Sequence, residues 1–313
     1  MDYETLFLDC GPKTSRGGGP ESPVWLITAP TEEEQKSLLA ELKIDEHTLH
    51  SALDPDEPAR LEYEPDHTAM IFNRPKNYSE KDKFLFKIGS LGLFLFEKRL
   101  VIVTVDDVPL LSGKGFNAID SVSDVLLRVL NRAIGHFLEH LKVINMIADD
   151  IEKKINSSME NKHLLNLFSL EKSLVYYLNA IAGNDAVLTR LKNSAGRLNF
   201  SPHLVEFLED VIIENTQCYR QSEIYSNILA SLMDARASIV SNNLNILMKT
   251  LNLMTIVIMI PTLIVSVFSM NVTIPLEKHE LAFWFIVALA VISGVGVLMW
   301  WNYFIKTLHK KHK

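Results

Sequence analysis

Five polar side chains recur in alternating steps of three and four residues through an apolar segment near the end of the 313-residue chain. They are Asn252, Thr255, Thr262, Ser266 and Ser269, and Met259 takes the remaining place in the series. A repeat of about 3.5 residues places such positions on one face of a helix and is typical of left-handed bundles. Neutral oxygen atoms along one face could accept hydrogen bonds from the water shell of a cation without binding it tightly, which would suit a pore lining.

The same series continues towards the N-terminus through Met248, Asn245, Ser241, Ser238 and Asp234. Close helix packing is the competing interpretation, because Ser and Thr are common at membrane helix interfaces. Packing explains the hydroxyl groups, but it explains the two Asn residues and the acidic end less well, since a wet path is the usual reason to keep such groups on one face. One such helix per chain cannot enclose a pore, so the pore interpretation requires a homo-oligomer around an axis.

Two long uncharged segments predict two membrane-spanning helices. No charged residue occurs in 250–276 or in 281–305, and about 20 apolar residues suffice to cross a bilayer. Lys249 precedes the first segment and four Lys residues follow the second, whereas the connector 271–280 holds one Lys. The positive-inside rule therefore places both termini in the cytoplasm and the connector outside, as expected for a multi-pass protein of the cell membrane.

The charges of the chain are unevenly distributed. Residues 1–249 carry a net charge of −10, whereas residues 250–313 carry +3. A nucleic-acid-binding protein is expected to present a basic face, so the acidic first part argues against that class. Cys10 and Cys218 are too few and too far apart for a disulfide framework or a Cys-based zinc site. The first 19 residues lack the continuous apolar run of a signal peptide.

The sequence contains no motif typical of catalysis or nucleotide binding. Gly17-Gly18-Gly19 is not followed by the Lys-Ser or Lys-Thr of a phosphate-binding loop, and the ten His residues are scattered. We therefore expect neither an enzyme, nor a bound nucleotide, nor a resident cofactor.

A very long helix must carry the polar series. Ser201 and Pro202 have the residue types of an N-cap and a first helical position, and Pro261 is the only later Pro or Gly before residue 271. At 1.5 Å per residue this helix would be roughly 100 Å long. Upstream, apolar residues at helical spacing predict two helices within 117–200, with a hinge at Asn156-Ser157-Ser158.

The first 110 residues predict a mixed α/β domain. Strands are expected at 24–28, 68–72, 84–88, 91–96 and 100–105, the last three as a meander. Thr31 and Glu34 have the spacing of a capping box, which predicts a helix that continues to Leu42. The segment 54–58, Asp-Pro-Asp-Glu-Pro, is rich in turn formers and predicts a linker.

The residues at the end of the first apolar segment resemble a known family. Phe268-Ser269-Met270-Asn271 is similar to the Tyr-Gly-Met-Asn signature of the CorA family of divalent-cation channels, and the stretches 245–251 and 259–262 stand at family-like spacing. The resemblance covers the whole architecture and implies a funnel-shaped homopentamer with long helices around its axis. Its parts would be an α+β cytoplasmic domain (1–110), an all-α helical hairpin (117–200), a very long stalk helix that continues into the first transmembrane helix (201–270), an extracytoplasmic loop (271–280), a second C-terminal transmembrane helix (281–305) and a basic cytoplasmic tail (306–313).

The resemblance also implies roles for particular residues. Ser269, Met270 and Asn271 would form the selectivity filter, in which Asn271 binds the metal ion through its hydrating water. The pore lining would comprise Asp234, Ser238, Ser241, Asn245, Met248, Leu251, Asn252, Thr255, Met259, Thr262 and Ser266, with a hydrophobic gate at Met248 and Leu251. Asp210 falls at an acidic position of the family's regulatory metal site between subunits. The chain departs from the family at the partner acid of this site, which is not at its expected place in the stretch around 50–54, so that Asp54 or Asp56 would have to substitute for it.

The activity implied by the resemblance is passive conduction of Mg²⁺, with Co²⁺ or Ni²⁺, into the cytoplasm. Mg²⁺ gives up its water reluctantly and prefers oxygen, which suits a ring of Asn carboxamides. The chain departs from the family at Phe268 and Ser269, where the family has Tyr and Gly. Ser269 keeps open a zinc transporter or a poorly selective cation pore of the same superfamily. A membrane-anchored regulatory scaffold is the alternative from another class.

Overall fold

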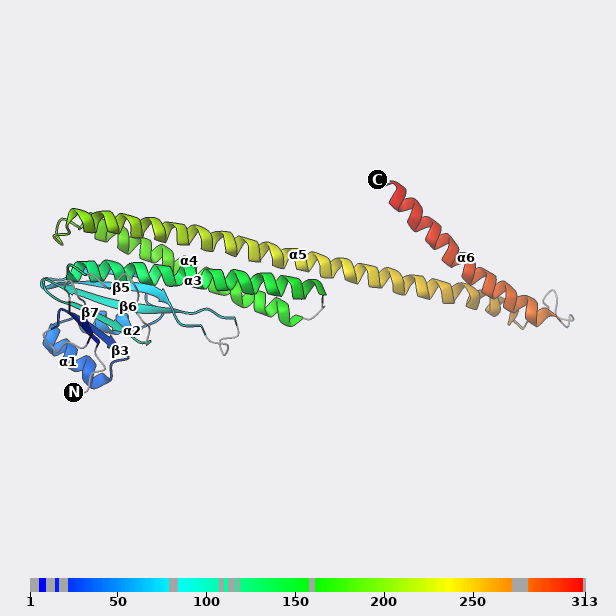
Figure 1. Cartoon of the computed structure of the whole chain (residues 1–313). Helices are drawn as coiled ribbons and strands as arrows, with labels where there is room; N and C mark the ends of the chain where they lie inside the picture. The colour runs from blue at the N-terminus through cyan, green and yellow to red at the C-terminus, as the bar shows by residue number, and fades with distance from the viewer. Residues whose placement is uncertain are drawn as a thin grey trace. The chain divides into compact units, whose positions relative to one another are not determined.

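A computed structural model of the chain describes residues 6–9, 15–16, 22–78, 84–106, 110–111, 116, 119–157, 161–271 and 281–311 (Figure 1). The side chains that it describes are those of the same residues without 6–9, 15–16, 155–157, 161–163 and 304–311. The chain divides into two compact units, Met1–Met233 and Asp234–Lys313.

The first unit contains a seven-stranded sheet. Its strands are β1 (Leu6–Asp9), β2 (Ser15–Arg16), β3 (Val24–Thr28), β4 (Arg60–Tyr63), β5 (His67–Pro75), β6 (Ile88–Phe96) and β7 (Leu100–Thr104). The strand order is β2-β1-β3-β7-β6-β5-β4, in which only the β3–β7 pair is parallel. The parallel pair requires a crossover between β3 and β7. The chain makes this crossover through α1, α2 and the strands β4 to β6.

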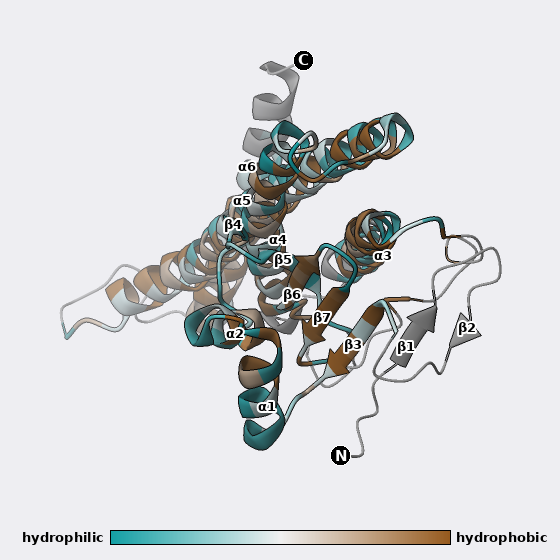
Figure 2. Ribbon diagram, turned by 90° about the vertical axis from the view of Figure 1, so that its left-hand side faces the viewer, coloured by the Kyte–Doolittle hydropathy of each residue, from teal (hydrophilic) through white to brown (hydrophobic). Residues whose placement is uncertain are grey.

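Both faces of the sheet are covered, because its central strands are apolar on both sides (Figure 2). Helices α1 (Glu32–Leu42) and α2 (Glu46–Leu53) cover one face, where Ile27, Ile71 and Phe94 form part of a small core. Helices α3 (Val122–Ser157) and α4 (Asn161–Asn193) cover the other face, and their residues belong to a larger core. A sheet buried on both faces is typical of domains with three layers.

Most of the expected elements of this unit are present. β3 has the expected bounds, and Thr31 and Glu34 form the expected capping box of α1. The strand expected at 84–88 is wrong: Phe84 has a left-handed φ of 67° and β6 begins only at Ile88, because such a backbone conformation cannot continue a strand. Of the expected hinge at 156–158, residues 156 and 157 are still helical, and residue 158 lies outside the described part of the chain.

Helix α5 (Pro202–Phe268) is the long helix that the sequence predicts. It begins with the Ser201 side chain as its cap, since Oγ accepts a hydrogen bond from the Leu204 N–H at 3.4 Å. The helix is not interrupted at Pro261, and the boundary between the two units falls inside it. The second unit consists of the rest of α5 and helix α6 (Ala282–Lys311). Both helices are long and apolar enough to cross a membrane.

Candidate ion pathway

Helix α6 packs against one face of α5 in the second unit. The two helices approach each other at Gly294, where a methyl group would lie 3.4 Å from Pro261 Cγ and 3.8 Å from the carbonyl oxygen of Val257. The half-buried residues of this part of α5 follow a helical repeat on the same face: Leu253, Val257, Ile260, Pro261, Ile264 and Phe268. Small residues at the contact let the two backbones approach, as is usual between membrane helices.

The polar series lies on the opposite face of α5. At about 100° per residue, the middle of the series is about 180° around the helix from the middle of the face that α6 covers. All six positions are exposed: Asn252, Thr255, Met259, Thr262, Ser266 and Ser269. Helix α6 therefore leaves this polar face of α5 uncovered from Asn252 to Ser269.

The threonine hydroxyl groups on this face have a defined orientation. Thr255 Oγ1 donates to the carbonyl oxygen of Leu251 at 2.9 Å, and Thr262 Oγ1 donates to that of Ile258 at 2.7 Å. At the end of the helix, the Ser269 N–H donates to the Ser266 carbonyl oxygen at 3.1 Å. Asn271 follows the helix as an exposed residue. The expected filter residues thus stand at the end of α5, where the following residues 272–280 are outside the described part of the chain.

Towards its N-terminus, in both units, α5 leaves further positions of this series exposed. In the first unit its buried side chains include Leu208, Val211 and Cys218, which belong to the core shared with α3 and α4. Asp210 is exposed and stands in the same seven-residue repeat as Ser238, Asn245 and Asn252. Asp234, Ser238, Ser241, Asn245 and Met248 are exposed as well. One face of α5 therefore remains uncovered within each unit.

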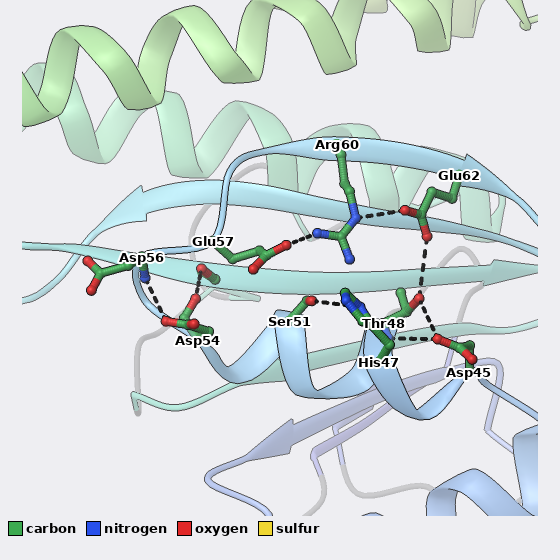
Figure 3. Close-up of polar contacts among 10 residues, drawn as sticks. Asp45, His47, Thr48, Ser51, Asp54, Asp56, Glu57, Arg60 and Glu62 are labelled. Carbon is green, nitrogen blue, oxygen red and sulfur yellow. Dashed lines mark hydrogen bonds and ion pairs between the residues drawn. The ribbon is translucent and has the colours of Figure 1, made fainter.

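Asp54 ends helix α2 and has a local structural role (Figure 3). Its Oδ1 accepts a hydrogen bond from the Asp56 N–H at 2.9 Å, and its carbonyl oxygen accepts one from Ser90 Oγ. In Figure 3 the Asp56 carboxylate points away from the neighbouring polar groups. Within the residues that the structure describes, no three His, Cys, Asp or Glu side chains are gathered to hold a metal ion. Neither Asp210 nor Asp54 therefore belongs to such a group within the described part of one chain.

Arg60 joins the carboxylates that follow Asp56 along the chain. It forms ion pairs with Glu57 and, at 2.7 Å between Nε and Oε1, with Glu62. The other Glu62 oxygen, Oε2, accepts a hydrogen bond from Thr48 Oγ1 at 3.3 Å (Figure 3). These contacts fasten β4 to α2, and they assign Glu57 and Glu62 a structural role.

Sequence reasoning did not find two buried polar contacts of the first unit. His140 Nδ1 lies 2.7 Å from the Tyr177 hydroxyl, and burial, followed by the neighbouring His136, lowers the pKa of His140 to about 4. The side-chain amide of Asn184 donates to the Asn73 carbonyl oxygen and accepts from the Asn73 N–H, both at 2.8 Å. Both contacts hold α3 or α4 in place, and neither involves a residue of the polar series of α5.

Comparisons with known proteins by sequence and by structure point to the same family. The sequence matches the model of a family described as "CorA-like Mg2+ transporter protein" over residues 21–303. It is 25% identical over 304 residues to the cobalt/magnesium transport protein CorA of Methanocaldococcus jannaschii, covering 93% of this chain and 88% of that protein.

Solved structures show the same fold. The complete structure of the CorA magnesium transporter from Methanocaldococcus jannaschii superposes with a TM-score of 0.80 at 20% identity, covering 98% of each chain. The structure of the full-length CmaX protein superposes with a TM-score of 0.70 at 16% identity, covering 97% of this chain and 98% of that one. The α/β domain, the long helix and the two apolar C-terminal helices are therefore features of a fold found in other proteins.

Proposed function

Because the chain belongs to the family of CorA-like Mg²⁺ transporter proteins, we propose that it is a passive channel that conducts Mg²⁺, with Co²⁺ or Ni²⁺, through a pore lined by α5. A transporter family is not an enzyme family, and its two apolar C-terminal helices suit a protein of the membrane. The name of the relative from Methanocaldococcus jannaschii supports Mg²⁺ and Co²⁺ as the transported ions.

The observation that carries the proposal is the uncovered polar face of α5, opposite α6. The Thr255 and Thr262 hydroxyl groups donate to their own helix, but facing lipid they would leave their lone pairs without donors, and Asn252 would place a whole carboxamide in hydrocarbon, which is costly. The same face in several copies around an axis would enclose a wet path, and five copies would follow the family resemblance. Each copy would place α6 on the outside, between α5 and the lipid.

In this channel Asn271 forms the outer ring that selects the hydrated ion. Thr262, Met259 and the residues of the series on their cytoplasmic side line the path. Met248 and Leu251 form its gate, and Asp234 attracts cations to the cytoplasmic mouth. Both termini lie in the cytoplasm. A negative potential inside then drives a divalent ion inwards with about 4.6 kcal/mol per 100 mV, so that conduction requires no nucleotide.

Regulation by the transported ion is the second part of the proposal. Asp210 of one copy and Asp54 or Asp56 of its neighbour would hold Mg²⁺ between subunits, since hard cations prefer carboxylate oxygen. The exposure of Asp210 and the outward orientation of the Asp56 carboxylate support this assignment.

Ion flux into liposomes that contain the purified chain tests the proposal. Mg²⁺, Zn²⁺, Co²⁺ and Na⁺ are compared under an imposed negative potential, with wild type and Asn271→Ala. Asn302→Ala in α6 is the matched control, because it removes an exposed carboxamide from the other helix. We expect Mg²⁺ flux in the wild type and in Asn302→Ala, and its loss in Asn271→Ala.

Other outcomes distinguish the alternatives. Zn²⁺ or Na⁺ flux without Mg²⁺ flux would keep the pore and attribute its different selectivity to the hydroxyl of Ser269. No flux from a correctly assembled oligomer, with metal chelated to open the gate, would favour a membrane-anchored scaffold.

A further inference from the structure

We propose that Asn252 and Thr255 form a second binding site for the hydrated cation, at the opposite end of the membrane-spanning part of the pathway from Asn271. The inference rests on the proposed function, because it concerns the same pathway. The two residues are exposed on the face of α5 that α6 leaves uncovered, and they are three residues apart, or roughly 4.5 Å along the helix axis.

The position of this pair is that of an inner site. Asn252 precedes Asn271 by 19 positions in the sequence, which corresponds to roughly 28 Å of helix and to nearly the whole thickness of the hydrocarbon core, about 30 Å. The proposed gate residues Leu251 and Met248, and Lys249 between them, follow on the cytoplasmic side. A cation that has crossed the membrane therefore meets Thr255 and Asn252 last, before the apolar residues of the gate.

The hydrogen bonding of Thr255 gives it the chemistry for this task. A threonine hydroxyl has one proton to donate and two lone pairs that accept. Thr255 Oγ1 donates its proton to the Leu251 carbonyl oxygen at 2.9 Å, so its lone pairs remain for a ligand. The water shell of a cation turns O–H groups outwards and requires acceptors. The side chain is thus prepared to accept from a hydrated cation and cannot donate to an anion at the same time.

Asn252 adds a second acceptor to each copy. Its carboxamide oxygen stands one turn below Thr255 on the same face and carries no net charge. Neutral oxygen rings bind weakly enough to release the ion, which conduction requires. Beyond this pair the face continues with Met248, which is 62% exposed and offers no oxygen. The pair therefore holds the ion together with its water immediately before the apolar constriction.

Thr250 provides a matched control in the same helix. Its Oγ1 donates to the Ile246 carbonyl oxygen at 2.9 Å, the same bond that Thr255 makes. Thr250 lies five residues before Thr255, and therefore about 140° around the helix from it. Replacement of either Thr by Val removes the same hydroxyl with little change of shape, but only Thr255 lies on the polar face.

The test compares Mg²⁺ flux in liposomes for wild type, Thr255→Val, Thr250→Val and Thr255→Ser. We expect Thr255→Val to lower the flux about tenfold and to raise the half-saturating Mg²⁺ concentration, because each copy loses an acceptor. Asn252→Leu should have the same effect. Thr255→Ser should restore the flux, since Ser can make the same bond to its helix, and Thr250→Val should stay within about twofold of the wild type.

Assembly of every variant is checked by size-exclusion chromatography in detergent, and Thr255→Ala replaces Thr255→Val should the valine disturb assembly. Equal flux in assembled Thr255→Val and Thr250→Val would overturn the second site and leave the channel standing. Loss of flux in both variants to the same extent would also overturn it, because the effect would not depend on the face. Absence of Mg²⁺ flux from the wild type would overturn the proposed function, and the second site with it.

Discussion

His140 shows how a single buried residue makes the stability of the first unit depend on pH. Its side chain is buried on α3 against Tyr177, and burial lowers its pKa to about 4. An unfolded His has a pKa of about 6.5. Between these values the unfolded chain binds a proton that the folded chain does not, so the stability that His140 contributes is complete above about pH 6.5 and is lost as the pH falls towards 4.

Urea unfolding of the full chain in detergent checks this expectation. The free energy of unfolding should fall between about pH 7 and pH 5, and His140→Gln should make that fall shallower, because Gln does not titrate. Part of the slope should remain, since burial also lowers the pKa of His136. His50→Gln is the control, as the His50 side chain is 63% exposed. Identical pH dependence in wild type and His140→Gln would contradict the prediction.

Asn184 has a different role, because it completes a strand. β4 pairs with β5 only from Thr68 to Ile71, which leaves the backbone of Asn73 without a strand neighbour on that side. The Asn184 amide makes both missing hydrogen bonds, and its side chain is fully buried. Asn184→Ala should therefore lower the free energy of unfolding by about 3 kcal/mol, since two buried backbone groups lose their partners.

The urea midpoint of the full chain measures this effect. Asn179→Ala is the matched control, because Asn179 is an exposed Asn on the same helix, and it should change stability by less than about 0.5 kcal/mol. Asn184→Asp should be at least as harmful as Asn184→Ala, because a buried carboxylate cannot donate to the Asn73 carbonyl oxygen. Equal midpoints for the Asn184 and Asn179 variants would refute the role of Asn184.

Buried contacts of this kind could not be predicted from the sequence. Asn73 and Asn184 are 111 positions apart, and neither has a neighbour in the sequence that signals the other. His136 and His140 were recognisable as a pair on one helical face, but the partner Tyr177 comes from the next helix. The polar series of α5 was predictable because its signal is local, a repeat of side-chain types along one helix, and the structure then placed α6 on the opposite face.

At the scale of elements, the helix ends were easier to predict than the short strands. Ser201 with Pro202, and Thr31 with Glu34, mark helix starts by cap chemistry that depends on a few adjacent residues. Helix α2 and strand β4 were missed because they are only eight and four residues long. Asp45, which accepts from the Thr48 N–H as the N-cap of α2, was the signal that could have found the helix.

The contact between α5 and α6 gives a prediction about how two helices pack. Gly294 is buried, and a methyl group at its position would lie 3.4 Å from Pro261 Cγ. A methyl group at Gly296 would have no other atom within 4 Å. Gly294→Leu should push α6 away from α5 and lower the thermal stability of the detergent-solubilised protein, because close approach requires a small residue. Gly296→Leu should leave stability nearly unchanged.

Gly294→Ala refines the same test. The distance of 3.4 Å is an ordinary van der Waals contact, so Ala should be tolerated where Leu is not. Thermal unfolding followed by size-exclusion chromatography measures all three variants. If Gly296→Leu destabilised the protein as much as Gly294→Leu, the face of α6 assigned to α5 would be wrong.

At the scale of the whole molecule, charge and pathway complement each other. Residues 1–249 carry −10, while the apolar part of α5 carries the neutral oxygen atoms of the polar series. In the proposed channel, the acidic part would raise the local concentration of cations, and the neutral part would let them pass without tight binding. In a pentamer the acidic parts would sum to about −50. Attraction and passage are therefore assigned to different segments of one chain.

This division predicts a dependence on ionic strength. Raising a monovalent salt from about 0.01 to 0.15 M shortens the screening length from about 30 to 8 Å, so Mg²⁺ flux at low Mg²⁺ should fall, while flux at saturating Mg²⁺ should change little. Asp234→Asn should weaken the salt effect, because it removes the exposed carboxylate nearest the membrane on the polar face, whereas Glu33→Gln on α1 removes an equal charge far along the sequence. Flux assays in liposomes at the two salt concentrations compare these variants with the wild type.

The same salt dependence in both variants would contradict a local role for Asp234. A wild-type flux insensitive to salt at low Mg²⁺ would contradict electrostatic attraction by the acidic part altogether.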